Sequence, residues 1–360
     1  MAKARPVGLL LALAALVLAL APAAQARVPK DYIGITSEDV FAGSSSYRDS
    51  TISSQASMRI GLTRQTFDWS DIERSKGHYS LTAYDAYVAA EATHGMRVLP
   101  ILFRAPGFYR RSHGRDACPP RSNKSMASFA QALVARYGPR GSLWKDRPGL
   151  RKVPIRSWEI WNEPSLAAYW CGKPKAKAYV KMLKTVGRAI KKRDRHAEIV
   201  TAGLPNSLLR RAVRLTKFIK QMYKAKAARY FDTLAINSYA KNKKALTHLL
   251  RSVRALMNRS HDRRAKIWIT EIGWGDKGPR SRFIVGAKGQ ASRIKSSIAY
   301  IRKARRRLKL RGFVYFSWRD AGAYPPAFQD LWGLHTGLLT RTGAQKPAFA
   351  AFQGAVRKLR

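Results

Sequence analysis

Acidic residues are scarce in this chain. Its 360 residues include 69 Lys and Arg but only 21 Asp and Glu, which gives a formal net charge of +48 at pH 7. A field of this size concentrates polyanions without specificity, so it favours an acidic partner such as a cell-wall polymer, a uronate-bearing polysaccharide or lipid head groups. Affinity for nucleic acid would follow from charge alone, and we expect no specific nucleic-acid partner. The stronger interpretation is that many of these cations form a solvated face on outer helices, as in the basic run at 302–307.

Cysteine and histidine are also few. Two cysteines, Cys118 and Cys171, are too few for a disulfide-rich scaffold or a cysteine-based metal site. In an exported protein they predict one disulfide, and two buried free thiols are the alternative. The seven histidines are scattered, and there is no His-Glu-x-x-His, no P-loop and no Gly-x-Ser-x-Gly turn. We therefore expect neither a metal nor an organic cofactor.

Long apolar runs are limited to the N-terminus. The stretch Gly8–Ala21 follows Lys3 and Arg5 and precedes a small-x-small site at residues 24–26. Its 14 residues fall short of the roughly 20 that cross a bilayer. Residues 1–26 are therefore predicted to be a cleaved signal peptide, with an uncleaved anchor as the alternative.

The rest of the chain, residues 27–360, contains no low-complexity linker and no further run that could span a membrane. It predicts a single domain that is secreted, extracellular or associated with the cell wall. Strong self-repulsion between positive charges favours a monomer.

Short apolar runs alternate with longer amphipathic segments along this domain. One such segment carries Met126, Phe129, Leu133 and Tyr137 at helical spacing. The alternation is typical of β/α units around a parallel sheet. Eight strands are predicted, the number that closes a (β/α)8 TIM barrel: Tyr32–Thr36, Gly61–Gln65, Arg97–Phe103, Ile155–Trp161, Glu198–Gly203, Thr233–Ser238, Lys266–Glu271 and Gly312–Ser317. An open doubly wound sheet is the competing fold, but the first turn lacks a G-x-G-x-x-G motif.

Two of the predicted strands end at a glutamate. Glu163 follows the fourth strand, between Asn162 and Pro164, and Glu271 ends the seventh. Barrel enzymes place their active sites at the C-terminal ends of the strands. Two carboxylates facing each other there suit glycosidic cleavage, in which one protonates the departing oxygen and the other acts at the anomeric carbon. Glu159 lies about 13 Å deeper along its strand, so it is a poor second catalytic carboxylate.

These segments resemble clan A of the glycoside hydrolases, which includes many cellulases, mannanases and β-xylosidases. The most specific match is residues 161–164, Trp-Asn-Glu-Pro, and residues 270–274 and 63–73 are similar to two further clan segments. The resemblance covers essentially the whole domain and implies a retaining mechanism, with Glu163 as acid/base and Glu271 as nucleophile.

The resemblance also implies roles for neighbouring residues. Arg64 and Tyr239 would hold Glu271 ionised, and Asn162 would hydrogen-bond a sugar hydroxyl. Trp318 would lie under the sugar. Among the further candidates for substrate contact is Asn237, which stands where many members carry a histidine and so leaves the subfamily and the pH optimum open. The remaining aromatic candidates for sugar stacking are Trp69, Trp170, Trp274 and Trp332.

The sequence thus predicts a glycosidase that hydrolyses β-linked oligo- or polysaccharide, and its charge favours an acidic carbohydrate. The alternative is a non-catalytic, strongly basic protein that binds cell-wall or polyanionic glycans on a degenerate barrel. The sugar, the linkage and the choice between endo and exo action depend on loop shape, which the sequence does not reveal.

Overall fold

The computed structural model describes residues 28–110, 117–322 and 330–359. The predicted signal peptide, residues 1–26, lies outside this part of the chain. None of the helices described has the length and apolar character that crossing a membrane requires.

The strands form a closed parallel barrel, as predicted. In the described part of the chain they are β1 Ile33–Thr36, β2 Leu62–Asp68, β3 Arg97–Phe103, β4 Ser157–Ile160, β5 Glu198–Thr201, β6 Leu204–Pro205, β7 Thr233–Asn237, β8 Lys266–Ile272 and β9 Leu310–Phe316. Each pairs with its neighbour in parallel, β1 closes on β9, and β5 and β6 both pair with β7. The segments β5 and β6 therefore share the fifth of eight barrel positions, and β5 ends at Thr201, two residues before the predicted end at Gly203.

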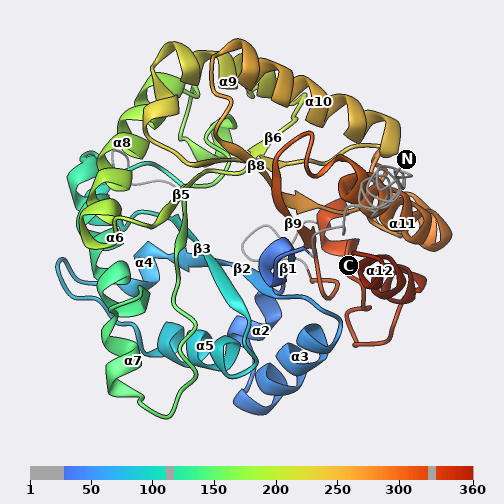
Figure 1. The fold of residues 1–360 in the computed structure, drawn as a ribbon, viewed down its shortest axis with the longest axis horizontal. Coiled ribbons are helices and arrows are strands. Elements are labelled where there is room, and N and C mark those ends of the chain that lie inside the picture. The colour runs from blue at the N-terminus through green and yellow to red at the C-terminus, as the bar shows by residue number, and fades with distance from the viewer. Residues whose placement is uncertain (1–27, 111–116, 323–329, 360) are drawn as a thin grey trace, which may run out of the picture.

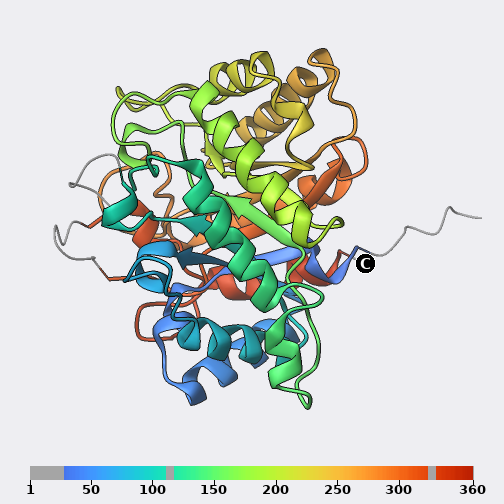
Figure 2. The same ribbon diagram turned by 90° about the vertical axis from the view of Figure 1, so that its left-hand side faces the viewer.

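Helices surround the barrel on all sides (Figure 1). The described helices are α2 Glu38–Ala42, α3 Ser45–Ser57, α4 Trp69–Ile72, α5 Thr82–Thr93, α6 Asn123–Tyr137, α7 Ser142–Asp146, α8 Ala176–Arg193, α9 Leu215–Lys224, α10 Lys243–Arg259, α11 Gly286–Ala304 and α12 Pro347–Arg357. Figure 2 shows α6 and α8 side by side along the outside of the barrel. The apolar stripe predicted from Met126 to Tyr137 is buried on α6, because residues three and four apart share the face that packs on the sheet.

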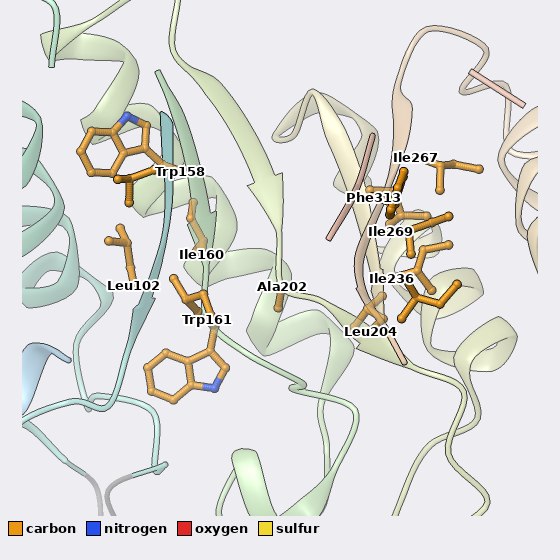
Figure 3. Packing of buried hydrophobic residues seen from close by; sticks show 14 of the residues in the cluster. Leu102, Trp158, Ile160, Trp161, Ala202, Leu204, Ile236, Ile267, Ile269 and Phe313 are labelled. Atoms are coloured by element: carbon orange, nitrogen blue, oxygen red, sulfur yellow. The ribbon is translucent and has the colours of Figure 1, made fainter. Parts of the chain in front are cut away.

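Two apolar layers hold the barrel together. Six buried side chains from alternate strand positions fill its interior: Leu62, Leu99, Val200, Ala235, Trp268 and Val314. The intervening positions point outward and pack against the helices, and Figure 3 labels such residues on several strands, including Ile160, Ile236 and Ile269. Successive side chains of a strand point to opposite faces. Polar residues that point inward beyond the apolar interior therefore lie at one end of the barrel.

Candidate active site

Glu163 lies in a tight turn just beyond β4. The strand ends at Ile160, earlier than predicted, and both Trp161 and Glu163 have positive φ, at 73° and 43°. The turn is closed by Leu166 N–H, which donates to the Glu163 carbonyl at 2.9 Å. Non-glycine residues adopt this left-handed conformation at a cost and are enriched at functional sites. The turn, and not a continuing strand, sets the direction of the Glu163 side chain.

Glu271 reaches the same end of the barrel because β8 contains a bulge. Ile236 of β7 lies opposite Ile269, but the next residue, Asn237, lies opposite Glu271 and not Thr270. The register also shifts on the other side of β8 between Ile269 and Ile272. A bulge inserts one residue and re-aims the side chains around it, so Glu271 takes the inward position that strict alternation would give to its predecessor.

Arg64 of β2 connects this glutamate to the interior of the barrel. Its guanidinium donates to Glu271 Oε1 at 2.8 Å and to both carboxyl oxygens of Glu159 at 2.7 Å, with a longer bond of 3.2 Å to Asn162 Oδ1. Burial alone would lower the pKa of Arg64, but the two carboxylates raise it well above its usual value. Arg64 is thus a permanent cation beside Glu271, as the sequence predicted, and Glu159 is its structural partner.

Tyr239 completes the environment of Glu271. Its hydroxyl donates to Glu271 Oε2 at 2.5 Å. Burial, with the nearby Glu271 and Glu163, raises the pKa of Tyr239 well above its usual value, so its proton is retained. One carboxyl oxygen of Glu271 therefore faces a cation and the other a neutral donor, and both contacts favour the ionised carboxylate.

Glu163 has a different environment, built around Asn237. The Asn237 amide donates to Glu163 Oε1 at 2.8 Å, and its own carbonyl accepts from Thr270 Oγ1 at 2.9 Å. Gly203 makes room for this pair, since a Cβ there would lie 2.2 Å from Asn237 Oδ1. Asn237 is fully buried, so in this structure it contacts the candidate acid and is not exposed to a sugar.

Burial raises the pKa of Glu163 to about 8, and the charge of Glu271 contributes to the rise, while Asn237 and Arg64 oppose it. Near neutral pH Glu163 therefore holds a proton in a site where Glu271 has contacts that favour its charge. A carboxyl group that keeps its proton, beside one that accepts from a cation and a hydroxyl, is the arrangement that acid and nucleophile roles require.

Most of the tryptophans proposed as sugar platforms are covered. Trp318 and Trp274 are 3% and 1% exposed, and Trp69 and Trp170 are also buried. Trp318 packs against Phe349 of α12 with ring centroids 5.8 Å apart, and the Trp274 indole donates to the Ala240 carbonyl. Stacking needs a free ring face, so a platform at Trp318 or Trp274 does not fit this structure, in which both side chains have packing roles.

Partly exposed aromatic rings lie elsewhere beside Glu271. Trp332 contacts Tyr239 with centroids 4.8 Å apart, Phe283 contacts Trp332 at 4.6 Å, and Phe316 contacts Tyr239 at 6.3 Å. All three are partly exposed. Trp332 was among the predicted candidates. Sequence reasoning missed Phe283 and Phe316, although Phe316 ends the last strand, which was an available signal.

Cys118 and Cys171 form a disulfide across 53 residues, as predicted. The bond joins the loop after β3 to the loop after β4, which carries Glu163. It fixes two neighbouring walls of the barrel mouth. No group of three or more His, Cys, Asp or Glu that could hold a metal ion occurs in the part of the chain that the structure describes.

The fold and the paired glutamates define a (β/α)8 barrel with a carboxylate site at its mouth. Solved structures with this fold include a family 39 glycoside hydrolase from Bacteroides cellulosilyticus WH2, with a TM-score of 0.65 and 18% identity over 92% of this chain. A monomeric β-xylosidase from Caulobacter crescentus CB15 has a TM-score of 0.64 and 17% identity over 91% of this chain. GH5_18 from Streptomyces cattleya in complex with GlcNAc has a TM-score of 0.69 and 15% identity over 93% of this chain.

The chain spans 64%, 68% and 81% of these three proteins. No protein-family model matches it, and no curated protein matches its sequence. The neighbours are clan A glycoside hydrolases, so the resemblance predicted from the motifs is confirmed for the fold.

Proposed function

We propose that the protein is a retaining glycoside hydrolase for β-linked oligo- or polysaccharide, with Glu271 as nucleophile and Glu163 as acid/base. The observation that carries this proposal is the contrast between the two carboxyl groups. Glu271 accepts from Arg64 and Tyr239, which favour its charge, whereas the pKa of Glu163 is raised to about 8. A structural glutamate at a strand end does not require such a contrast.

In the first step Glu163 gives its proton to the glycosidic oxygen as the bond from this oxygen to the anomeric carbon breaks. A carboxylate oxygen of Glu271 attacks that carbon and forms a covalent glycosyl-enzyme. Arg64 and Tyr239 hold the two carboxyl oxygens of Glu271 by hydrogen bonds during the attack, and Glu163 is left as a carboxylate.

In the second step Glu163 removes a proton from water, and the water oxygen attacks the anomeric carbon as the bond to Glu271 breaks. Both glutamates return to their starting protonation states. Two inversions at one carbon retain its configuration. We expect the two carboxyl groups to act across roughly 5 to 5.5 Å, the spacing typical of retaining enzymes.

The partly exposed rings of Trp332, Phe283 and Phe316 are suited to the apolar faces of a sugar next to Glu271. The names of the structural neighbours, which include β-xylosidases and complexes with GlcNAc, support a carbohydrate substrate. The N-terminal apolar segment supports export, which would bring the enzyme to extracellular or cell-wall glycans.

The test is turnover of a panel of aryl β-glycosides and polysaccharides by the purified protein, beside Glu163→Ala and Glu271→Ala, at high salt to suppress charge-driven binding. Asp49→Ala removes an exposed carboxylate from α3 and is the matched control. We expect Glu271→Ala to lose at least about 1,000-fold in kcat/KM on every substrate, comparable to the loss of a catalytic group. Glu163→Ala should lose about as much on polysaccharides, whose leaving oxygen needs a proton, and the control should retain activity.

Azide separates the two roles. With an activated aryl glycoside, azide should rescue Glu271→Ala as the inverted glycosyl azide and Glu163→Ala as the retained one, because only the second variant still forms the covalent intermediate. No turnover on any substrate, together with unchanged glycan binding in both variants, would establish the alternative, a non-catalytic binding protein.

A further inference from the structure

A basic hollow lies at the end of the barrel opposite the candidate active site. One cavity of about 980 Å³ is lined by residues at the starts of β3, β4, β5, β7, β8 and β9. A second, of about 800 Å³, extends between the ends of α6 and α8. The two share Arg156, Lys191, Arg195 and His196, so they are adjacent, and together they are here called the basal hollow.

Positive charge dominates the lining of the basal hollow. Twelve of its residues are Lys or Arg, and five are acidic: Asp31, Asp194, Glu198, Asp232 and Asp262. Nothing in the barrel fold demands such an excess. Cations near helix C-termini are favoured by the helix dipole, which accounts for a few at the end of α8, but Lys266 and Arg311 lie on strands.

The acidic residues of the basal hollow are already engaged. Arg311 bridges Asp31 at 2.7 Å and Glu198 at 3.2 Å. Lys191 pairs with Asp232 at 2.9 Å, and Arg156 lies 3.7 Å from Asp194.

Asp262 accepts from the Tyr223 hydroxyl and from the backbone N–H of Ala265. Each of the five carboxylates therefore has a partner inside the protein, and four of the five are paired with a cation.

Several cations of the basal hollow remain without a carboxylate. Within residues 28–110, 117–322 and 330–359, no ion pair involves Arg195, Arg264, Lys266 or Arg306. All four are exposed. The only side-chain partner of Arg195 in this part of the chain is His196, whose Nε2 accepts from it at 2.9 Å. Like charges gathered in a concave surface repel each other, and a bound polyanion relieves that repulsion.

The shape and lining of the basal hollow favour a single polysaccharide chain. A flat bilayer cannot enter a concave hollow. Single-stranded nucleic acid is held by exposed aromatic rings on which bases stack, but Tyr32 and Phe231, the Tyr and Phe residues of the lining, are 2% and 7% exposed. A polysaccharide with repeated carboxylates needs only exposed cations for its binding, and no exposed aromatic ring.

We propose that the basal hollow is a second glycan-binding site, which holds a linear carboxylate-bearing polysaccharide on the face away from the catalytic glutamates. Lys266 lines the hollow and Glu271 lies five residues along the same strand, so the two sites are separated by roughly 17 Å. A chain in the basal hollow would keep the enzyme on an acidic matrix while the mouth stays open to substrate.

The test compares two triple variants with the same change in charge. Arg195→Glu, Arg264→Glu and Arg306→Glu together reverse unpaired cations of the basal hollow. Lys217→Glu, Arg251→Glu and Lys288→Glu reverse exposed cations on α9, α10 and α11 that do not line it. Affinity for polygalacturonate is measured by calorimetry between about 0.05 and 0.3 M NaCl, with dextran, polyuridylate RNA and phosphatidylglycerol vesicles as further probes.

We expect the basal triple to weaken polygalacturonate binding at least tenfold and to flatten its dependence on salt, with the control triple within about twofold of the parent protein. Equal losses in both triples would overturn the proposal, because bulk charge would then explain the binding. Stronger basal-dependent binding of RNA or of vesicles than of polygalacturonate would also overturn it. Turnover is not measured, so the result is independent of the catalytic proposal. Circular dichroism confirms that both variants fold.

Discussion

Asn237 is the residue that holds the carboxyl group of Glu163 by a hydrogen bond. Its amide donates to Glu163 and is oriented by Thr270. Burial raises the pKa of Glu163 to about 8, and Asn237 opposes this rise because a hydrogen-bond donor favours the charged carboxylate. The acid step needs protonated Glu163, and activity should therefore fall as pH rises through about 8.

Asn237→Leu, which removes the amide at similar size, should move this alkaline limb to higher pH by roughly half a unit to one unit, the equivalent of one hydrogen bond. The measurement is kcat/KM against pH on an aryl glycoside. Asn258→Leu, at an exposed position on α10, is the control and should leave the limb in place. A limb that stays unmoved in Asn237→Leu would show that another group sets it.

Gly203 holds the same cluster by its lack of a side chain. A Cβ would lie 2.2 Å from Asn237 Oδ1 and 2.8 Å from Thr270 Oγ1, and the Gly203 N–H donates to Glu159. Gly203→Ala should lower the free energy of unfolding by about 1 to 3 kcal/mol, the usual cost of overpacking, and should reduce kcat by displacing Asn237.

Urea denaturation and steady-state kinetics check this prediction. Gly354→Ala is the matched control, because nothing lies within 4 Å of a Cβ at that position of α12. At this position the substitution should raise the free energy of unfolding by about 0.5 to 1 kcal/mol, because alanine lowers the entropy of the unfolded chain. Equal effects of the two substitutions would contradict the close approach seen at Gly203.

At the scale of elements, α5 carries a buried carboxyl group that the active site does not use. Burial raises the pKa of Glu91 to about 8, although the Thr63 and Tyr87 hydroxyls beside it oppose the rise. The folded protein then binds a proton that the unfolded chain releases near the ordinary glutamate pKa of 4.5. The free energy of unfolding should therefore decrease as pH rises from about 4.5 to about 8.

Glu91→Gln should remove this pH dependence, since the amide cannot ionise. We expect it to be more stable than the parent at about pH 9, by on the order of a few kcal/mol, and close to the parent at about pH 4.5. Urea unfolding at the two pH values measures the difference. The same change in stability at both values would mean that Glu91 is ionised in the folded protein.

At the scale of the whole molecule, the net charge of +48 works against compactness. Surface repulsion is screened over about 10 Å at 0.1 M salt, so the Tm should rise by several degrees between about 0.02 and 0.5 M NaCl. Differential scanning calorimetry measures the rise, and glucose at matched osmolality is the control. A Tm that falls or stays constant would show that the cations are already neutralised by contacts within the fold.

Much of the fold could be predicted because its signals are local. The apolar stripe on α6, the eight short apolar runs and a glutamate after two of them each lie within a few residues of sequence. Parallel strands then bring their C-terminal ends together. The predicted pairing of Arg64 with Glu271 followed from the family motif and is present at 2.8 Å.

Local patterns in the amino-acid sequence predict the barrel, the end at which both glutamates gather and the disulfide between the two cysteines. Which side chains remain reachable depends on how the distant segments pack together. Trp318 is buried and packs against Phe349 of α12, the bulge in β8 turns Glu271 inward, and separate strand starts and helix ends combine into the basal hollow. These outcomes depend on contacts between segments far apart in the chain, and no local pattern of residues encodes which distant side chain will cover or face another.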